Sequence, residues 1–125
     1  MKGILQEVSV SKGQLEASIS EAIIKFEKEH MGRGPEEVRT YILGDMVLVR
    51  LKGVLTPAEK QMVNNEEGRR LIKQVRENLI ENARNILATI IKDTTGRNMI
   101  SLHTDISTKS GERVIIFVLD KKIAD

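Results

Sequence analysis

Several residue types are missing or scarce in this chain of 125 residues. Cysteine is absent, which excludes disulfide bonds, thiolate metal sites and cysteine nucleophiles. Tryptophan is also absent, and there are only one tyrosine and two phenylalanines, so aromatic platforms that stack on bases or sugars are nearly lacking. No apolar run approaches the roughly 20 residues that a membrane-spanning helix needs.

Charge is balanced along the chain. The formal net charge at pH 7 is +2, and basic residues adjoin one another only at Arg69-Arg70 and Lys121-Lys122. Binding to phosphate backbones needs a clustered basic patch, so we expect no nucleic-acid partner. The first residues, Met1–Glu7, turn polar and acidic too early for a signal peptide. We therefore expect a cytoplasmic protein with no direct membrane insertion.

One structural plan occurs twice in the chain. A long amphipathic helix runs into a Gly-Arg pair and two short β-rich segments follow, first over residues 11–52 and again over residues 65–119. At this length the chain makes one domain, residues 1–125, with an N-terminal arm (1–10) and a C-terminal tail (120–125). The doubled plan predicts an α+β fold, αββαββ, with a four-stranded antiparallel sheet and two long helices packed mainly on one face.

The first long helix has a clear start and one apolar face. Ser11 and Gln14 have the spacing of a capping box, in which each side chain binds the other residue's backbone N–H. Glu27 is expected away from the apolar face. That face consists of Leu15, Ile19, Ala22, Ile23 and Phe26.

A second helix start is marked by Thr56-Pro57-Ala58-Glu59, with threonine at the N-cap, proline at the first helical position and glutamate at the third. A short helix is expected there, followed by the second long helix. The predicted stripe of that helix consists of Ile72, Val75, Leu79, Ala83, Ile86, Leu87 and Ile90. Leu71, Ile80 and Ile91 lie beside it, which makes the apolar face wider than one sheet would cover.

The strands are expected over Val38–Leu43, Met46–Leu51, Met99–Ile106 and Val114–Leu119, and Gly44-Asp45 is a two-residue turn between the first two. The second and fourth strands are apolar on both faces. A sheet with helices on one side leaves its other face open, and exposed apolar side chains there favour self-association, with a dimer preferred. The alternative is that the N-terminal arm or the short helix covers this face.

The third strand carries the only candidate pair for metal or proton chemistry. Ile100, Leu102, Thr104 and Ile106 alternate with Ser101, His103 and Asp105. Because residues two apart on a strand project to the same side, His103 and Asp105 could share a metal ion or a proton. Two ligands do not complete a metal site, so the simpler interpretation is a solvated sheet face, with no metal, no cofactor and no catalytic residues.

Two arginines, Arg33 and Arg97, occupy equivalent places in the two copies, each beside a glycine just past a helix end. One interpretation is a pair of anion-binding residues supported by nearby backbone N–H groups. The other is that each arginine satisfies the last helix carbonyls, where the helix dipole favours positive charge. The segment Gly32-Arg33-Gly34-Pro35 is not a phosphate loop, because it lacks the Lys-Ser/Thr ending and follows a helix.

An ordered set of short motifs resembles a known bacterial family. The motifs are Gly32-Arg33-Gly34-Pro35, Leu55-Thr56-Pro57-Ala58-Glu59, Thr95-Gly96-Arg97 and Ser101-Leu102-His103-Thr104-Asp105. Together they are similar to the MpsC family, named after the third component of the sodium-translocating membrane-potential-generating system, over roughly residues 11–120. The resemblance implies association with a membrane system, and no catalytic residues come with it.

These observations lead to one main expectation and two alternatives. The main expectation is a non-enzymatic accessory or regulatory protein that is homo-oligomeric, peripheral to the inner face of the membrane, and docked on a membrane-protein partner of a sodium-translocating system. The first alternative is a module that senses a small anion or a nucleotide near Arg33 or Arg97. The second is an enzyme that uses His103 and Asp105, which requires a third polar partner in a concave pocket.

Overall fold

The computed structural model describes residues 10–123 of the chain. The predicted arm and tail thus lie partly outside the described residues, at positions 1–9 and 124–125. The elements in chain order are α2 (Lys12–His30), β1 (Glu37–Leu43), β2 (Met46–Lys52), α3 (Pro57–Met62), α4 (Glu66–Asn82), α5 (Arg84–Thr95), β3 (Met99–Ser107) and β4 (Glu112–Leu119).

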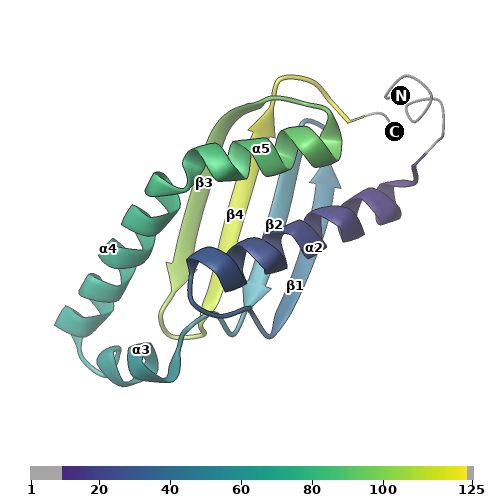
Figure 1. Cartoon of the computed structure of the whole chain (residues 1–125). Helices are drawn as coiled ribbons and strands as arrows, with labels where there is room; N and C mark the ends of the chain where they lie inside the picture. Colours follow the sequence, from purple (N-terminus) through teal and green to yellow (C-terminus); the bar gives the residue numbers. More distant parts are fainter. Residues whose placement is uncertain (1–9, 124–125) are drawn as a thin grey trace.

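The predicted α+β fold is confirmed. One four-stranded sheet has the strand order β1-β2-β4-β3, and every neighbouring pair is antiparallel. Helices α2 and α5 cross one face of the sheet, and α4 continues from α5 beyond the β3 edge (Figure 1). No element among residues 10–123 covers the other face, which we call the outer face.

The core lies between the sheet and the two crossing helices. The sheet contributes alternate side chains of each strand, because successive residues of a strand point to opposite faces. Val47, Val49 and Leu51 from β2 and Ile115 and Phe117 from β4 are fully buried. They meet the buried side chains of the helices, which are Ile19, Ile23, Phe26, Ile72, Ile80, Leu87 and Ile91.

Local sequence signals predicted several element boundaries correctly. The side chain of Ser11 accepts from the Gln14 N–H at 3.1 Å, and Gln14 returns the bond, so the predicted capping box is present. Thr56 and Glu59 form the same reciprocal pair at the start of α3. Gly44 adopts the left-handed φ of +64° that a two-residue hairpin turn requires.

The second long helix is broken into two. The backbone of Ala83 departs from helical geometry, with φ −97° and ψ 9°, and α4 ends there while α5 begins on the next residue. The prediction of one continuous helix was therefore too simple. The break lets α5 cross the sheet while α4 projects past the edge of β3 (Figure 1).

The predicted apolar stripe of this helix is confirmed at Ile72, Ala83 and Leu87, which are buried, and is wrong at three other positions. Val75, Leu79 and Ile86 were expected in the core, but all three are exposed, and 51% of the surface of Val75 is accessible. The row that faces the core instead contains Arg76, which is only 2% exposed, between Ile72 and Ile80. Hydrophobicity alone selected the wrong row because an arginine occupies the middle of the buried one.

Two further expectations are corrected. Glu27 was placed on the polar side of α2, yet it is 1% exposed and belongs to the buried face. In β3 the register shifts between Met99 and Ser101, which is a bulge, and Ile100 beside it remains 63% exposed. A bulge inserts one unpaired residue and so interrupts the alternation that had placed Ile100 with the core residues.

Candidate functional site

The two loop arginines lie at opposite ends of the sheet. Arg33 precedes the start of β1, and its Nη1 donates to the Leu55 carbonyl at 3.3 Å. Arg97 precedes the start of β3, and its Nε donates to the Lys122 carbonyl at 3.1 Å. Because the start of β3 pairs with the end of β4, it lies at the opposite end of the sheet from the start of β1 (Figure 1). The two guanidinium groups therefore do not line one pocket, and each one ties a loop to a neighbouring segment.

The predicted pair on β3 lies on the outer face. His103 Nε2 is 3.2 Å from the Ser101 hydroxyl, and both side chains are on the open surface. Asp105 is 3.4 Å from the ammonium group of Lys73 on α4, and it accepts a hydrogen bond from the Ile106 N–H. Among the described residues, no group of three His, Asp or Glu side chains comes together that could hold a metal ion.

The outer face divides into an apolar half and a charged half. The apolar half surrounds the end of the β1–β2 hairpin and contains Tyr41, Leu43, Met46, Leu48, Ile116 and Val118, with Ser101 and His103 beside them on β3. The charged half is nearer the other end of the strands and contains Glu37, Arg39, Arg50, Lys52, Asp105 and Glu112, with Val114 between Arg50 and Asp105. Tyr41, Leu43 and Met46 are exposed hydrophobic residues, so no segment of residues 10–123 covers the apolar half completely.

Ion pairs hold most of the charged half in place. Arg50 donates two hydrogen bonds to Glu112 on β4, at 2.9 and 2.7 Å, and so links the two central strands. Arg39 donates to Glu37 at 2.8 Å. That hydrogen bond, with the nearby charge of Lys52, holds the pKa of Glu37 below its ordinary value. Lys52 itself has no ion pair among residues 10–123.

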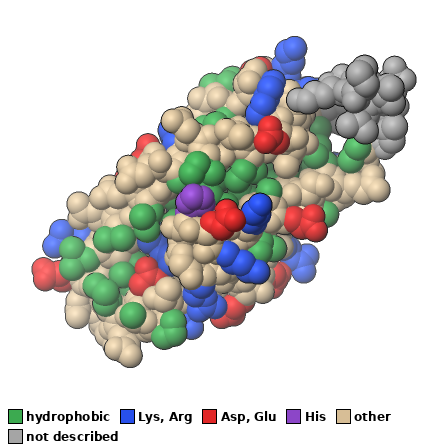
Figure 2. Space-filling view, viewed as in Figure 1, with side chains coloured by type: hydrophobic (Ala, Val, Ile, Leu, Met, Phe, Trp, Pro, Cys, Tyr) green, Lys and Arg blue, Asp and Glu red, His purple; other side chains and the backbone are tan. Residues whose placement is uncertain are grey.

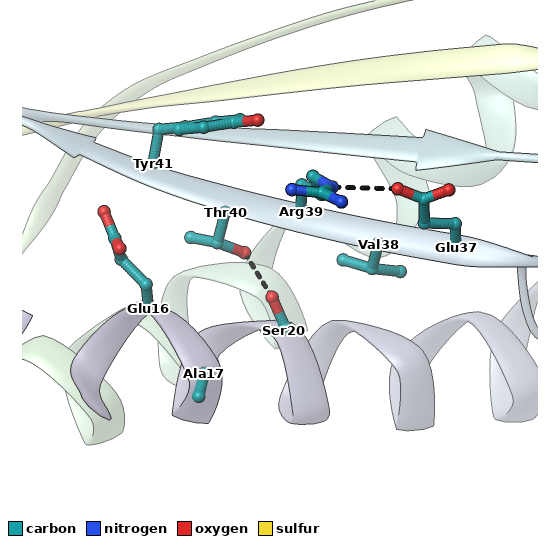
Figure 3. A pocket seen from close by; sticks show the side chains of 8 residues that line it. All are labelled: Glu16, Ala17, Ser20, Glu37, Val38, Arg39, Thr40 and Tyr41. Carbon is teal, nitrogen blue, oxygen red and sulfur yellow. Dashed lines mark hydrogen bonds and ion pairs between the residues drawn. The ribbon is translucent and has the colours of Figure 1, made fainter. Parts of the chain in front are cut away.

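A shallow hollow lies between α2 and the free edge of β1 (Figure 3). Its polar groups are already paired, because the Ser20 and Thr40 hydroxyls are 2.7 Å apart and Glu16 accepts from the Ile42 N–H at 2.8 Å. An edge strand exposes unpaired backbone groups that invite another strand. Glu16 therefore closes part of this edge, and the hollow is better explained as edge protection than as a ligand site.

A second exposed apolar surface runs along the projecting helices, and we call it the α4 stripe. Figure 2 shows hydrophobic side chains grouped over α4 and α3, at the lower left of the molecule as viewed in Figure 1. The stripe consists of Met62, Leu71, Val75 and Leu79, all of which are exposed. Leu71, Val75 and Leu79 recur every four residues and so lie in one row of the helix surface.

A buried charged cluster lies under the same helices. Arg76 forms a bidentate pair with Glu59 of α3, with Nη2 to Oε1 at 2.6 Å and Nε to Oε2 at 3.1 Å, and it also donates to the Val54 carbonyl at 2.8 Å. Burial by itself would raise the pKa of Glu59, but the hydrogen bonds from Arg76 and Thr56 outweigh it, so the pKa is lowered. The cluster therefore fastens α3 and the segment after β2 to α4.

Arg113 and Glu27 complete this cluster. Arg113 is 1% exposed on β4 and donates to the Thr104 hydroxyl at 2.8 Å, while its Nε and Nη2 have no hydrogen-bond partner among the described residues. Burial raises the pKa of Glu27, although the charges of Arg113 and Arg76 act in the opposite direction. Burial likewise lowers the pKa of Arg113.

Little in the sequence indicates this buried cluster. Glu27 and Arg113 look like solvated charges, since lone charged residues are almost always exposed. One signal was available for Arg76, because its neighbours at four-residue spacing, Ile72 and Ile80, are both apolar. A charged residue in the middle of an apolar row indicates a paired buried ion.

Within residues 10–123, no helix is long and apolar enough to cross a membrane.

Comparison with known proteins agrees with the resemblance seen in the motifs. Residues 11–121 match the family model described as the Na+-translocating membrane potential-generating system (MpsC). The uncharacterized protein YbcI of Bacillus subtilis (strain 168) is 47% identical over 109 residues, which are 87% of this chain and 88% of that protein. The uncharacterized protein YrhF of the same strain is 29% identical over 105 residues, 83% of this chain and 86% of that protein. No solved structure matches the chain.

The family match spans all eight described elements, from the start of α2 to the end of β4. It includes both Gly-Arg loops and the buried cluster. On this basis, the chain belongs to the MpsC family.

Proposed function

We propose that this protein is a non-enzymatic accessory or regulatory subunit that docks on a membrane-protein partner of a sodium-translocating, membrane-potential-generating system. The family description supplies the kind of system. The observation that carries the docking role is the α4 stripe. It presents three large apolar side chains in one row on a helix that projects beyond the sheet.

The stripe has the form of a helix-in-groove contact. Such contacts use apolar side chains that recur every three or four residues on one helix face. Leu71, Val75 and Leu79 have this spacing, and the buried row beside them fastens α4 to the rest of the molecule through Arg76. A helix held in this way can present the stripe as a preformed surface, which reduces the entropy lost on binding.

Capture from sodium-pumping membranes tests this role. The tagged protein and its Val75→Asp variant are used to capture detergent-solubilised membrane proteins at several salt concentrations. Recovery of an ion-translocating membrane protein by the wild type, and its loss with Val75→Asp, is the expected result. Burying a carboxylate in an apolar contact is costly, so we expect at least a tenfold loss of capture, on the order of 1.4 kcal/mol or more.

Gln74→Glu is the matched control. It introduces the same charge at another exposed position of α4, about 100° around the helix axis from Val75. Capture by Gln74→Glu should equal that of the wild type. If no ion-translocating protein is recovered at any salt concentration, or if Val75→Asp captures it as well as the wild type does, the proposed docking role is wrong.

A further inference from the structure

The charges on the outer face are distributed unevenly between the side formed by β1 and β2 and the side formed by β4 and β3. The β1 and β2 side carries Arg39, Arg50 and Lys52 against Glu37. The β4 and β3 side carries only acids, Glu112 and Asp105. One side is therefore net positive and the other net negative, so the face has the charge pattern of a surface that is complementary to itself.

We infer that the outer face binds a second copy of this chain, with a twofold axis that runs parallel to the strands between β2 and β4. Such an axis places β1 over β3 of the second copy and β2 over β4. The strand register then fixes which side chains meet, because residues at the same height along the strands face one another. The result is two sheets packed face to face with nearly aligned strands, a common sheet arrangement.

Most of the face meets a suitable counterpart in this arrangement; the exception is Arg50, which faces Val114 of the second copy and stays paired with Glu112 of its own chain. Leu48 faces Ile116 of the second copy, and Met46 faces Val118, so apolar side chains cover one another. Arg39 comes opposite Asp105, and Lys52 comes opposite Glu112. Lys52, which has no ion pair among residues 10–123, acquires an acidic neighbour.

The other possible axis in the plane of the face gives a poor match. An axis perpendicular to the strands would place the apolar half of one copy over the charged half of the other. Leu48 would then cover Arg50, and Met46 would cover Lys52. This arrangement desolvates charges against apolar groups, which is costly. The axis parallel to the strands avoids these contacts on β2, so both the charge pattern and the apolar pattern favour it.

A stable dimer needs both halves of the face. Four strands about 4.8 Å apart and about seven residues long give a flat footprint of roughly 450 Å², and protruding side chains increase the area. A stable interface buries about 800 Å² of accessible surface on each partner. The apolar half alone is too small, so the charged half must also lie in the interface.

Charge-exchanged variants test this arrangement directly. Arg39→Asp alone places two acids opposite each other in a homodimer, and Asp105→Arg alone places two bases opposite each other. Both residues are exposed, so the fold should tolerate either change. Each variant should dimerise at least about tenfold more weakly than the wild type. In a one-to-one mixture, every facing pair becomes Asp with Arg, so the heterodimer should form with near wild-type affinity.

Light scattering after size-exclusion chromatography, over a range of concentrations, measures these species. Val75→Asp serves as a control that adds an acid to the α4 stripe and should leave the dimer intact. A monomeric wild type, or a mixture no tighter than its components, would overturn the inference. If the wild type is monomeric and Ile116→Arg abolishes capture of the membrane protein, then the outer face serves that partner and not a second copy.

Discussion

Arg76 and Glu59 form a bidentate ion pair between α4 and α3, and the arginine is almost completely buried while the glutamate remains partly accessible. The sequence distance between them is 17 residues, so the pair closes a loop that contains the whole α3–α4 junction. Removing one partner of a buried pair leaves an uncompensated charge or an empty space in the core. Substitutions in this cluster should therefore change the free energy of unfolding and its dependence on pH.

Truncation of the arginine should be strongly destabilising. We expect Arg76→Ala to lower the free energy of unfolding by about 3–5 kcal/mol, because it leaves Glu59 unpaired and the Val54 carbonyl without its donor. Arg70→Ala, on the exposed side of the same helix, should change it by less than about 0.5 kcal/mol. Urea denaturation of both variants measures the difference, and equal effects would show that the pair does not support the fold.

Acid should weaken the fold through Glu59. Its folded pKa lies below its ordinary value of 4.5, so the stability that it contributes is present above pH 4.5 and is lost as the pH falls through the folded pKa. The Glu59→Gln variant lacks this contribution. The difference in unfolding free energy between the wild type and Glu59→Gln should therefore shrink as the pH is lowered from 6 to about 3. A difference independent of pH contradicts the assigned pairing.

The contribution of Glu27 to the free energy of unfolding should depend on pH in the opposite direction. Burial raises its folded pKa above 4.5, so the folded state binds its proton more tightly than the unfolded state does. Its contribution is most favourable at pH values below 4.5 and declines as the pH rises through the folded pKa. Relative to Glu27→Gln, the wild type should lose stability with rising pH across that window. Urea titrations at closely spaced pH values detect this slope, and a slope of the other sign would mean that Arg113 and Arg76 dominate over burial.

The close approach of α3 to α4 requires a glycine at position 68. A Cβ atom there would lie 1.7 Å from the Met62 carbonyl oxygen, so Gly68→Ala must displace backbone and should cost about 2–3 kcal/mol or more. Gly13→Ala in α2 is the matched control, since a Cβ there meets nothing within 4 Å, and it should stabilise the fold by up to about 1 kcal/mol. Thermal melts of the two variants should shift in opposite directions.

The features predicted correctly from the sequence were those determined locally. The capping boxes at Ser11 and Thr56 and the hairpin turn at Gly44-Asp45 depend on residues within a few positions of one another. The αββαββ order followed from hydrophobic periodicity. The strand order β1-β2-β4-β3 did not, because it depends on how the second pair of strands inserts beside the first.

The candidate site was harder to predict, since its members come together only in three dimensions. Arg33 and Arg97 are equivalent in the repeated plan, but the antiparallel sheet separates them. Arg76 and Arg113 are buried because Glu59, Glu27 and a backbone carbonyl lie near them. None of those partners is close in sequence, so no local pattern identifies which groups pair with these arginines.

The projection of α4 past the edge of β3 keeps two surfaces apart. The α4 stripe and the outer face have no residue in common. Occupying one of them therefore leaves the other accessible. A pair of chains joined through their sheets carries two stripes, so it can engage two sites on an oligomeric target at once. The second contact then forms at a high local concentration, and two individually weak contacts give a long-lived complex.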